Sequence, residues 1–295
     1  MKLDVNIQNY INMKKISLLS TMVILAIACL GQDNITVCHT PSTEKFAMFA
    51  SNKEFNAAHL MPRNYVHVSE EGGKMIDYKC PDGKSANAYV IMSKKETNNW
   101  ILVFQEWWGL NDNIKRQSEE LYKDLGNVNV LALDLYDGKM ATDREKAGQY
   151  MQEFKQERGD MIVKGALNYV GKSAKIGTVG WCFGGGQSLL AALTAGKQAV
   201  ACVVYYGMPV DDVATLKTLN TDVLGIFGIQ DKWITPEVVQ KFESNMKAAG
   251  KKIVVKSYDA DHGFANPSNP MGAFNEAAYK DAYKNTLAFF KERVK

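Results

Sequence analysis

Short apolar segments alternate with amphipathic segments along most of the chain. Apolar runs typical of buried strands lie at residues 98–106, 128–136, 175–180, 199–207, 221–228 and 251–259. Segments whose apolar residues have helical spacing lie between or after them, at 111–126, 143–157, 160–170, from 183, from 236 and at 274–294. Continuous apolar strands that alternate with helices predict an α/β fold, in which helices cover both faces of a mostly parallel central sheet.

The sheet is expected to begin with an antiparallel edge. Residues 74–93 contain two short strand-like runs that meet at Pro81-Asp82-Gly83, which is a strong turn signal. With this hairpin the pattern predicts one α/β domain over residues 72–295, which is long enough to bury a substantial core.

The first 71 residues follow a different pattern. Residues 13–29, MKKISLLSTMVILAIAC, have two lysines, an apolar run and the small-residue triplet AIA before a cysteine. This is the anatomy of a secretory signal, so residues 1–28 are predicted to be a signal peptide with Met13 as its initiator. The apolar run is short for a membrane-spanning helix, which needs about 20 residues. A buried helix is the alternative.

Cys29 resembles the lipidated cysteine of a bacterial lipobox. Two exported forms stay open: a membrane-anchored lipoprotein and a freely secreted periplasmic protein. Residues 29–71 are polar and aperiodic, which predicts a tether and a poorly ordered lead-in, with a short helix around 54–60. Because disulfides persist outside the cytoplasm, Cys38 and Cys80 are candidates to pair.

Charge and cysteine spacing exclude several kinds of partner. The formal net charge is only +3, and no block of five or more Lys and Arg residues occurs, so no nucleic-acid surface is expected. The chain has no C-x-x-C pair and no Cys/His cluster at zinc spacing, so neither a metal nor another cofactor is expected. The sequence leaves a monomer and a homodimer open.

The segment GTVGWCFGGG, residues 177–186, is the main chemical signal. It runs from a strand through Gly-x-Cys-x-Gly, centred on Cys182, into a helix. This is the nucleophile-elbow pattern with cysteine in the place of serine. The glycines remove side chains that would collide across the turn, and the backbone N–H of Phe183 can face a developing oxyanion. A buried structural cysteine and a phosphate-binding glycine loop are the alternatives.

A thiol nucleophile needs a base, and the base needs an orienting carboxylate. Asp231 and His262 each follow one of the last two predicted strands, in the chain order nucleophile, acid, histidine. His262 is the only histidine after residue 71. Asp259 and Asp261 are alternative orienters, but their closeness to His262 in sequence favours a role in forming the turn.

Glu106 and Trp107 end the first buried strand. In this architecture the following loop supplies the second oxyanion donor, so the backbone N–H of Trp107 is the candidate. A solvated strand-end carboxylate is the alternative role for Glu106. Three more aromatic residues flank the predicted site and are candidates to line a substrate pocket, namely Trp108, Trp233 and Phe264.

Together these motifs resemble the dienelactone hydrolase (carboxymethylenebutenolidase) family. The matching pieces are QEWWGLN, DLYDGK, GTVGWCFGGG, YYG, GIQDKWITPE and DADHGFANP, in family order from about residue 73 to the C-terminus. The resemblance implies an α/β-hydrolase with the triad Cys182, His262 and Asp231, and with Glu106 as an auxiliary acid that contacts the resting thiol. The expected reaction is hydrolysis of a small carboxylic ester or lactone through a thioester acyl-enzyme.

The chain departs from the family at one position. Dienelactone-cleaving members hold the substrate carboxylate with arginines, one of them four residues after the catalytic histidine, where this chain has Asn266. Arg144 and Arg158 are candidates for the other arginine. An ester or lactone is therefore better supported than a dienelactone. The alternatives are a non-catalytic exported ligand-binding protein, a thiol-redox protein that uses Cys202, and a broad esterase acting on cell-envelope or polysaccharide esters.

Overall fold

An eight-stranded sheet forms the centre of the structure, a computed structural model that describes residues 41–63, 65–268 and 272–295. Its strands are β1 (Lys74–Lys79), β2 (Ser85–Ile91), β3 (Asn99–Phe104), β4 (Asn129–Leu133), β5 (Lys175–Trp181), β6 (Ala199–Tyr205), β7 (Val223–Gly228) and β8 (Ile253–Tyr258). Their order is β1-β2-β4-β3-β5-β6-β7-β8. The pairs β1–β2 and β2–β4 are antiparallel and the other neighbours are parallel, which confirms the predicted sheet.

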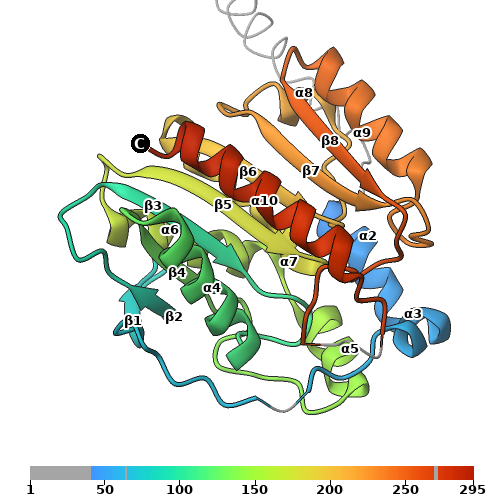
Figure 1. Cartoon of the computed structure of the whole chain (residues 1–295), viewed down its shortest axis with the longest axis horizontal. Helices are drawn as coiled ribbons and strands as arrows, with labels where there is room; N and C mark the ends of the chain where they lie inside the picture. Colours follow the sequence, from blue (N-terminus) through green and yellow to red (C-terminus); the bar gives the residue numbers. More distant parts are fainter. Residues whose placement is uncertain (1–40, 64, 269–271) are drawn as a thin grey trace, which may run out of the picture. The chain divides into compact units, whose positions relative to one another are not determined.

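Helices cover both faces of this sheet (Figure 1). On one face α4 (Asp112–Leu125) packs against α10 (Glu276–Arg293), and on the other α6 (Gln156–Val170) packs against α7 (Phe183–Ala195). The remaining helices of the domain are α5 (Arg144–Glu153), η2 (Gly196–Gln198), α8 (Val213–Leu216) and α9 (Pro236–Ala248). The break between α5 and α6 comes at Phe154 and Lys155, earlier than the sequence predicts, because both residues have extended backbones.

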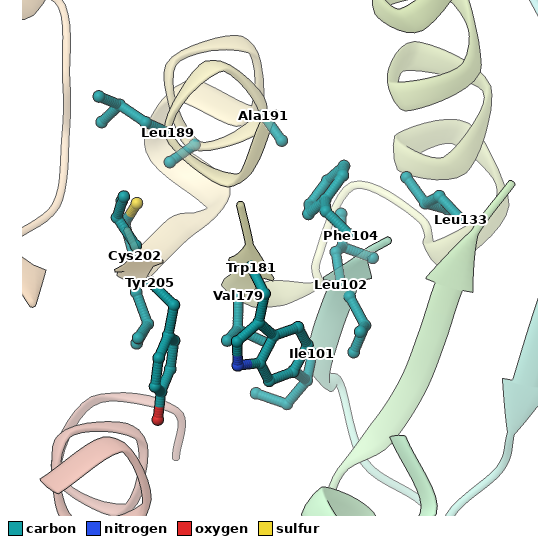
Figure 2. Close-up of a cluster of buried hydrophobic side chains, with 14 of the residues drawn as sticks. Ile101, Leu102, Phe104, Leu133, Val179, Trp181, Leu189, Ala191, Cys202 and Tyr205 are labelled. Carbon is teal, nitrogen blue, oxygen red and sulfur yellow. The ribbon is translucent and has the colours of Figure 1, made fainter. Parts of the chain in front are cut away.

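The core fills the space between the sheet and its helices (Figure 2). On β6, Cys202 points toward α7, where its Sγ lies 3.8 Å from Ser188 Oγ. Tyr205 of the same strand points to the opposite face and its hydroxyl lies 2.7 Å from that of Thr286 on α10. Burial on both faces explains why these strands are continuous apolar runs. Burial also raises the pKa of the Cys202 thiol to about 11, so Cys202 is an inert core residue.

Residues 41–63 fold onto the domain, where the sequence predicts a poorly ordered lead-in. They form α2 (Ser42–Ala47), η1 (Met48–Ser51) and α3 (Lys53–Ala58), so the short helix expected around 54–60 is the last of three. Phe46 and Phe55 are buried at 2% and 0% exposure. Polar contacts add to this packing, because Gln187 Nε2 donates to Thr43 Oγ1 over 3.0 Å. The compact unit accordingly spans Thr40–Lys295.

Several predictions concern residues that the structure does not describe. The signal peptide at 1–28 with its initiator Met13, the lipidation site Cys29 and the candidate disulfide partner Cys38 all lie outside the described residues. Cys80 is a buried free thiol. Among the helices that the structure describes, none combines the length and the apolar character needed to cross a membrane.

Candidate active site

Cys182 lies on a sharp turn between β5 and α7. Its backbone has φ 59° and ψ −120°, a strained conformation that side-chain-bearing residues rarely adopt. A Cβ atom at Gly180 would lie 2.1 Å from the carbonyl oxygen of Gly184, and one at Gly184 would lie 2.3 Å from that of Phe104. Both positions therefore require glycine, for the steric reason that the Gly-x-Cys-x-Gly pattern indicates.

His262 and Asp231 form a buried pair on the loops after β8 and β7. His262 Nδ1 donates to Asp231 Oδ2 over 2.7 Å, and the two side chains are 3% and 0% exposed. The other carboxylate oxygen accepts the backbone N–H groups of Trp233 and Ile234 over 2.8 and 2.9 Å. Burial alone would raise the pKa of Asp231, but His262 and these backbone donors lower it below its ordinary value. Asp231 is thus a fixed, ionised acceptor.

The two alternative carboxylates have other partners. Asp259 Oδ1 accepts from Gln230 Nε2 over 2.7 Å, and Asp261 Oδ1 accepts the backbone N–H of His262 over 2.7 Å. Neither bond reaches the imidazole ring. Asp259 and Asp261 therefore shape the turn that carries His262, and Asp231 is the residue that orients its ring.

Two imidazoles enclose the Cys182 thiol. Sγ, one ring nitrogen of His262 and one ring nitrogen of His59 all lie within 4.8 Å of one another. His59 Nε2 lies 4.0 Å from Sγ. His59 Nδ1 lies 2.7 Å from the carbonyl oxygen of Phe55, which can only accept a hydrogen bond, so Nδ1 carries the proton and Nε2 offers its lone pair to the thiol.

Burial sets the protonation of these groups. It raises the pKa of the Cys182 thiol above its ordinary value, so the resting group is a neutral thiol at neutral pH. Burial, together with the neighbouring His262, lowers the pKa of His59 to about 3, which keeps that ring neutral. Burial also disfavours the charged form of His262, but Asp231 and, once its proton has left, the Cys182 thiolate outweigh this effect, so that proton transfer from the thiol raises the pKa of His262 well above its ordinary value.

Glu106 and Asn266 form a second buried pair at the thiol. Asn266 Nδ2 donates to Glu106 Oε2 over 2.7 Å, while Asn266 Oδ1 accepts the backbone N–H of Ser268 over 2.9 Å. Burial raises the pKa of Glu106 to about 7, although His262 opposes the shift. Asn266 thus orients a carboxyl group at the position where the family resemblance leads one to expect a substrate-binding arginine.

This geometry agrees with the comparison to known proteins. The sequence model of the dienelactone hydrolase family matches residues 86–294. The chain belongs to this family. It is therefore a hydrolase, and its α/β-hydrolase fold is the fold of the solved structures that it resembles.

Two relatives of this family member match it over about three quarters of its length. Protein usf of Aquifex pyrophilus is 26% identical over 232 residues, which cover 75% of this chain and 98% of the relative. A carboxymethylenebutenolidase of a Pseudomonas species is 26% identical over 235 residues, covering 74% and 94%. A solved dienelactone hydrolase-like promiscuous phosphotriesterase from metagenomic libraries has a TM-score of 0.66 at 20% identity, covering 76% and 99%, and shares the fold.

Residues 41–63, which we call the cover segment, lie outside the family match and close the site of this dienelactone hydrolase family member. The cavity at Cys182 has a volume of about 30 Å³, with His59 and Leu60 of the cover segment in its wall. A cavity of this size can hold a water molecule and is far below the roughly 300–1,000 Å³ of typical ligand pockets. Figure 1 shows α2 and α3, in blue, beside the loops at one end of the sheet. We call this arrangement, with the cover segment over the thiol, the closed state.

The predicted aromatic pocket is mostly filled by protein. Of its three predicted members only Trp108 lines the cavity. Trp233 is covered by Phe55 of the cover segment, whose ring packs edge-on at 5.2 Å. Phe264 is fully buried in the core, 5.5 Å from Tyr206 and 5.3 Å from Tyr258 by ring centroids, so it is not a pocket residue in this state.

The two arginines considered for substrate binding also lie elsewhere. Arg158 forms ion pairs with Asp137 at 2.6 Å and Asp82 at 3.5 Å. Arg144 lines a separate cavity of about 510 Å³ beside Asn56. Neither arginine is in the wall of the cavity at Cys182.

Proposed function

We propose that this member of the dienelactone hydrolase family cleaves a small carboxylic ester or lactone with Cys182 as nucleophile, His262 as base and Asp231 as orienting acid. The observation that carries the proposal is the buried 2.7 Å bond from His262 Nδ1 to Asp231, with Cys182 Sγ within 4.8 Å of the imidazole. Because Asp231 keeps the proton on Nδ1, Nε2 is the nitrogen that exchanges a proton with sulfur.

In the first half-reaction the thiol proton moves to His262 Nε2 and the thiolate attacks the ester carbonyl carbon. The backbone N–H groups of Trp107 and Phe183 stabilise the resulting oxyanion. Phe183 begins α7, and the first N–H groups of a helix have no intrahelical acceptor. The C–O bond then breaks, His262 returns the proton to the alcohol oxygen, and a thioester remains on Cys182.

In the second half-reaction a water molecule attacks the thioester while His262 accepts its proton. The C–S bond breaks and the proton passes to sulfur, which restores the thiol and releases the acid. Glu106 has the role of an auxiliary acid. Its pKa of about 7 leaves it partly ionised at neutral pH, so its carboxylate can take up the thiol proton and relay it to His262, the group that later returns it to the alcohol oxygen.

The site favours an uncharged acyl group. The amide N–H of Asn266 is taken up by Glu106, and no lysine or arginine is among the described residues that line the cavity. A cavity of about 30 Å³ also cannot hold an ester, which means that the cover segment must move when substrate enters. We propose neutral esters or lactones as the substrate class. A screen that includes cell-envelope and polysaccharide esters tests whether the enzyme is a broad esterase.

The Cys182→Ala variant tests the role of the thiol. It should hydrolyse a small aryl ester at the uncatalysed rate while its circular dichroism and unfolding temperature stay those of the parent. Cys80→Ala is the matched control, because Cys80 is also a buried free thiol but lies on the β1–β2 turn. Full activity in Cys182→Ala would refute the proposal.

We further propose that the protein is exported by a bacterium and anchored through a lipid on Cys29. The support is the signal-like sequence at 13–28 and the cysteine that follows it. Mass spectrometry of the mature N-terminus distinguishes a diacylglyceryl cysteine from an unmodified cleaved end. A mature protein that still begins at Met1 would contradict both forms.

A further inference from the structure

Three side chains with metal-binding atoms converge at the candidate nucleophile. Cys182 Sγ and ring nitrogens of His59 and His262 lie within 4.8 Å of one another, although they come from the elbow, the cover segment and the loop after β8. A thiolate with two imidazoles is a ligand set that Zn²⁺ and similar divalent ions prefer. The sequence predicts no metal site because these residues are distant in the chain.

Both histidines are held in the way that metal-binding histidines usually are. Asp231 accepts from Nδ1 of His262 at 2.7 Å, and the Phe55 carbonyl accepts from Nδ1 of His59 at 2.7 Å. Each ring is thereby fixed with Nε2 available as a ligand. His262 Nε2 is buried and has no hydrogen-bond partner among the residues that the structure describes. A bound cation would satisfy this nitrogen.

The three ligand atoms are close enough to bind a tetrahedrally coordinated ion if they move slightly toward one another. Zinc bonded to sulfur and to imidazole nitrogen places these atoms roughly 3.3–3.6 Å apart. Cys182 Sγ and His59 Nε2 are 4.0 Å apart, and the widest separation in the group is at most 4.8 Å. The adjoining cavity of about 30 Å³ has room for one water as the fourth ligand.

We propose that Cys182, His59 and His262 bind a zinc-class divalent cation, and that the bound ion latches the cover segment over the active site. On binding, the thiol proton is released to solvent and a sulfur–metal bond replaces it. Each imidazole binds through Nε2 and keeps its Nδ1 proton, and the ion gives up hydration waters. Because His59 belongs to the cover segment, the full site exists only in the closed state, so the ion shifts the population toward that state.

An ion bound at Cys182 should inhibit ester hydrolysis. This expected inhibition rests on the proposed function, because it requires Cys182 to be the nucleophile. Binding of the cation does not depend on the proposed function. The two are therefore measured separately, by spectroscopy of the metal complex and by ester hydrolysis.

Cobalt titration of the metal-free full chain under anaerobic conditions tests the site. We expect one Co²⁺ per chain, with a sulfur-to-cobalt charge-transfer band and the intense visible bands of four-coordinate Co²⁺. Cys182→Ser should lose the charge-transfer band, and His59→Ala should weaken binding by roughly tenfold or more through loss of one of three protein ligands. Cys80→Ala controls for a thiol elsewhere, and Met48→Ala, at an exposed position, controls for a change in the cover segment.

Absence of the charge-transfer band in the parent protein, or equal Co²⁺ affinity in the parent and His59→Ala, would overturn the proposal. In the hydrolysis assay, Zn²⁺ should inhibit the parent and a chelator should restore its activity, while His59→Ala should need a roughly tenfold higher Zn²⁺ concentration. An intact cobalt spectrum in a protein that hydrolyses no ester would support the metal site and contradict the proposed function.

Discussion

His59 Nε2 lies 4.0 Å from Cys182 Sγ, although 123 positions separate the two residues in the sequence. This contact joins a segment outside the family match to the candidate nucleophile. Phe55, which lies one helical turn before His59, packs edge-on against Trp107 and Trp233 at 5.2 Å each. The cover segment therefore takes the space next to the thiol that a substrate needs.

Loosening the cover segment should expose the thiol. Phe55 is fully buried, and truncation of a buried phenylalanine to alanine costs about 3–5 kcal/mol of packing. We expect Phe55→Ala to raise the rate of Cys182 alkylation by iodoacetamide at least several-fold, measured by peptide mass spectrometry. Met48→Ala, at a position that is 70% exposed, should leave that rate unchanged. Equal alkylation rates in the two variants would show that the cover segment does not control access.

Removal of the orienting carboxylate should abolish most of the activity. Asp231→Asn cannot hold the proton on His262 Nδ1 in the same way, and in a Ser-His-Asp protease the equivalent change lowers kcat by about 10⁴. We expect a loss of about 10³–10⁴ in kcat for Asp231→Asn. Asp259→Asn is the control, because Asp259 contacts Gln230 and not the imidazole, and it should keep near-normal kcat. Similar losses in both variants would point to damage of the loops.

The raised pKa of Glu106 should appear in the pH dependence of stability. Its pKa is about 7 in the folded protein and has an ordinary value of 4.5, so the folded state binds this proton more tightly than the unfolded state. The free energy of unfolding should therefore fall as pH rises from about 4.5 to about 7, by up to about 3 kcal/mol from this group.

Glu106→Gln isolates that contribution, because its amide oxygen can still accept from Asn266. Urea unfolding of the parent and the variant at pH 5 and pH 7.5 measures the effect. The free energy of unfolding of the parent should be lower at pH 7.5 than at pH 5, and this decrease should be smaller in Glu106→Gln. Parallel pH dependences would show that Glu106 stays ionised in the folded state.

Asn266 should determine how the enzyme treats charged substrates. Asn266→Arg places a cation where the family resemblance indicates one, at the cost of the bond to Glu106. We expect the ratio of kcat/KM for a carboxylate-bearing lactone over a neutral ester to rise at least tenfold, since a charged hydrogen bond contributes about 1.5–3 kcal/mol. Asn266→Ala loses the same bond without adding charge. The ratio should stay low in Asn266→Ala, and an equal rise there would refute the charge argument.

Local steric and chain-order rules explain which features the sequence predicts well. The tight turn at Cys182 requires glycine at positions 180 and 184, so a pattern of five residues is enough to predict this turn. Asp231 and His262 follow parallel neighbouring strands, and parallel strands end at the same edge of the sheet. The fold and these three site positions depend only on such short-range patterns.

The cover segment depends on packing that no short pattern reports. Its helices are four to six residues long, too short to show a helical repeat. The available signal is three phenylalanines, Phe46, Phe49 and Phe55, in an otherwise polar stretch, which indicates a segment that packs against a domain. A short sequence pattern also does not show which way a loop side chain points. Phe264, for example, faces Tyr206 in the core rather than the cavity.

The central claim is that Cys182 forms a covalent acyl bond during ester hydrolysis. Rapid acid quenching of the enzyme during turnover of a small aryl ester, followed by peptide mass spectrometry, measures this directly. The account predicts that the acyl mass is found on the peptide that contains Cys182. Turnover with no acyl group on Cys182 at any quench time would contradict it.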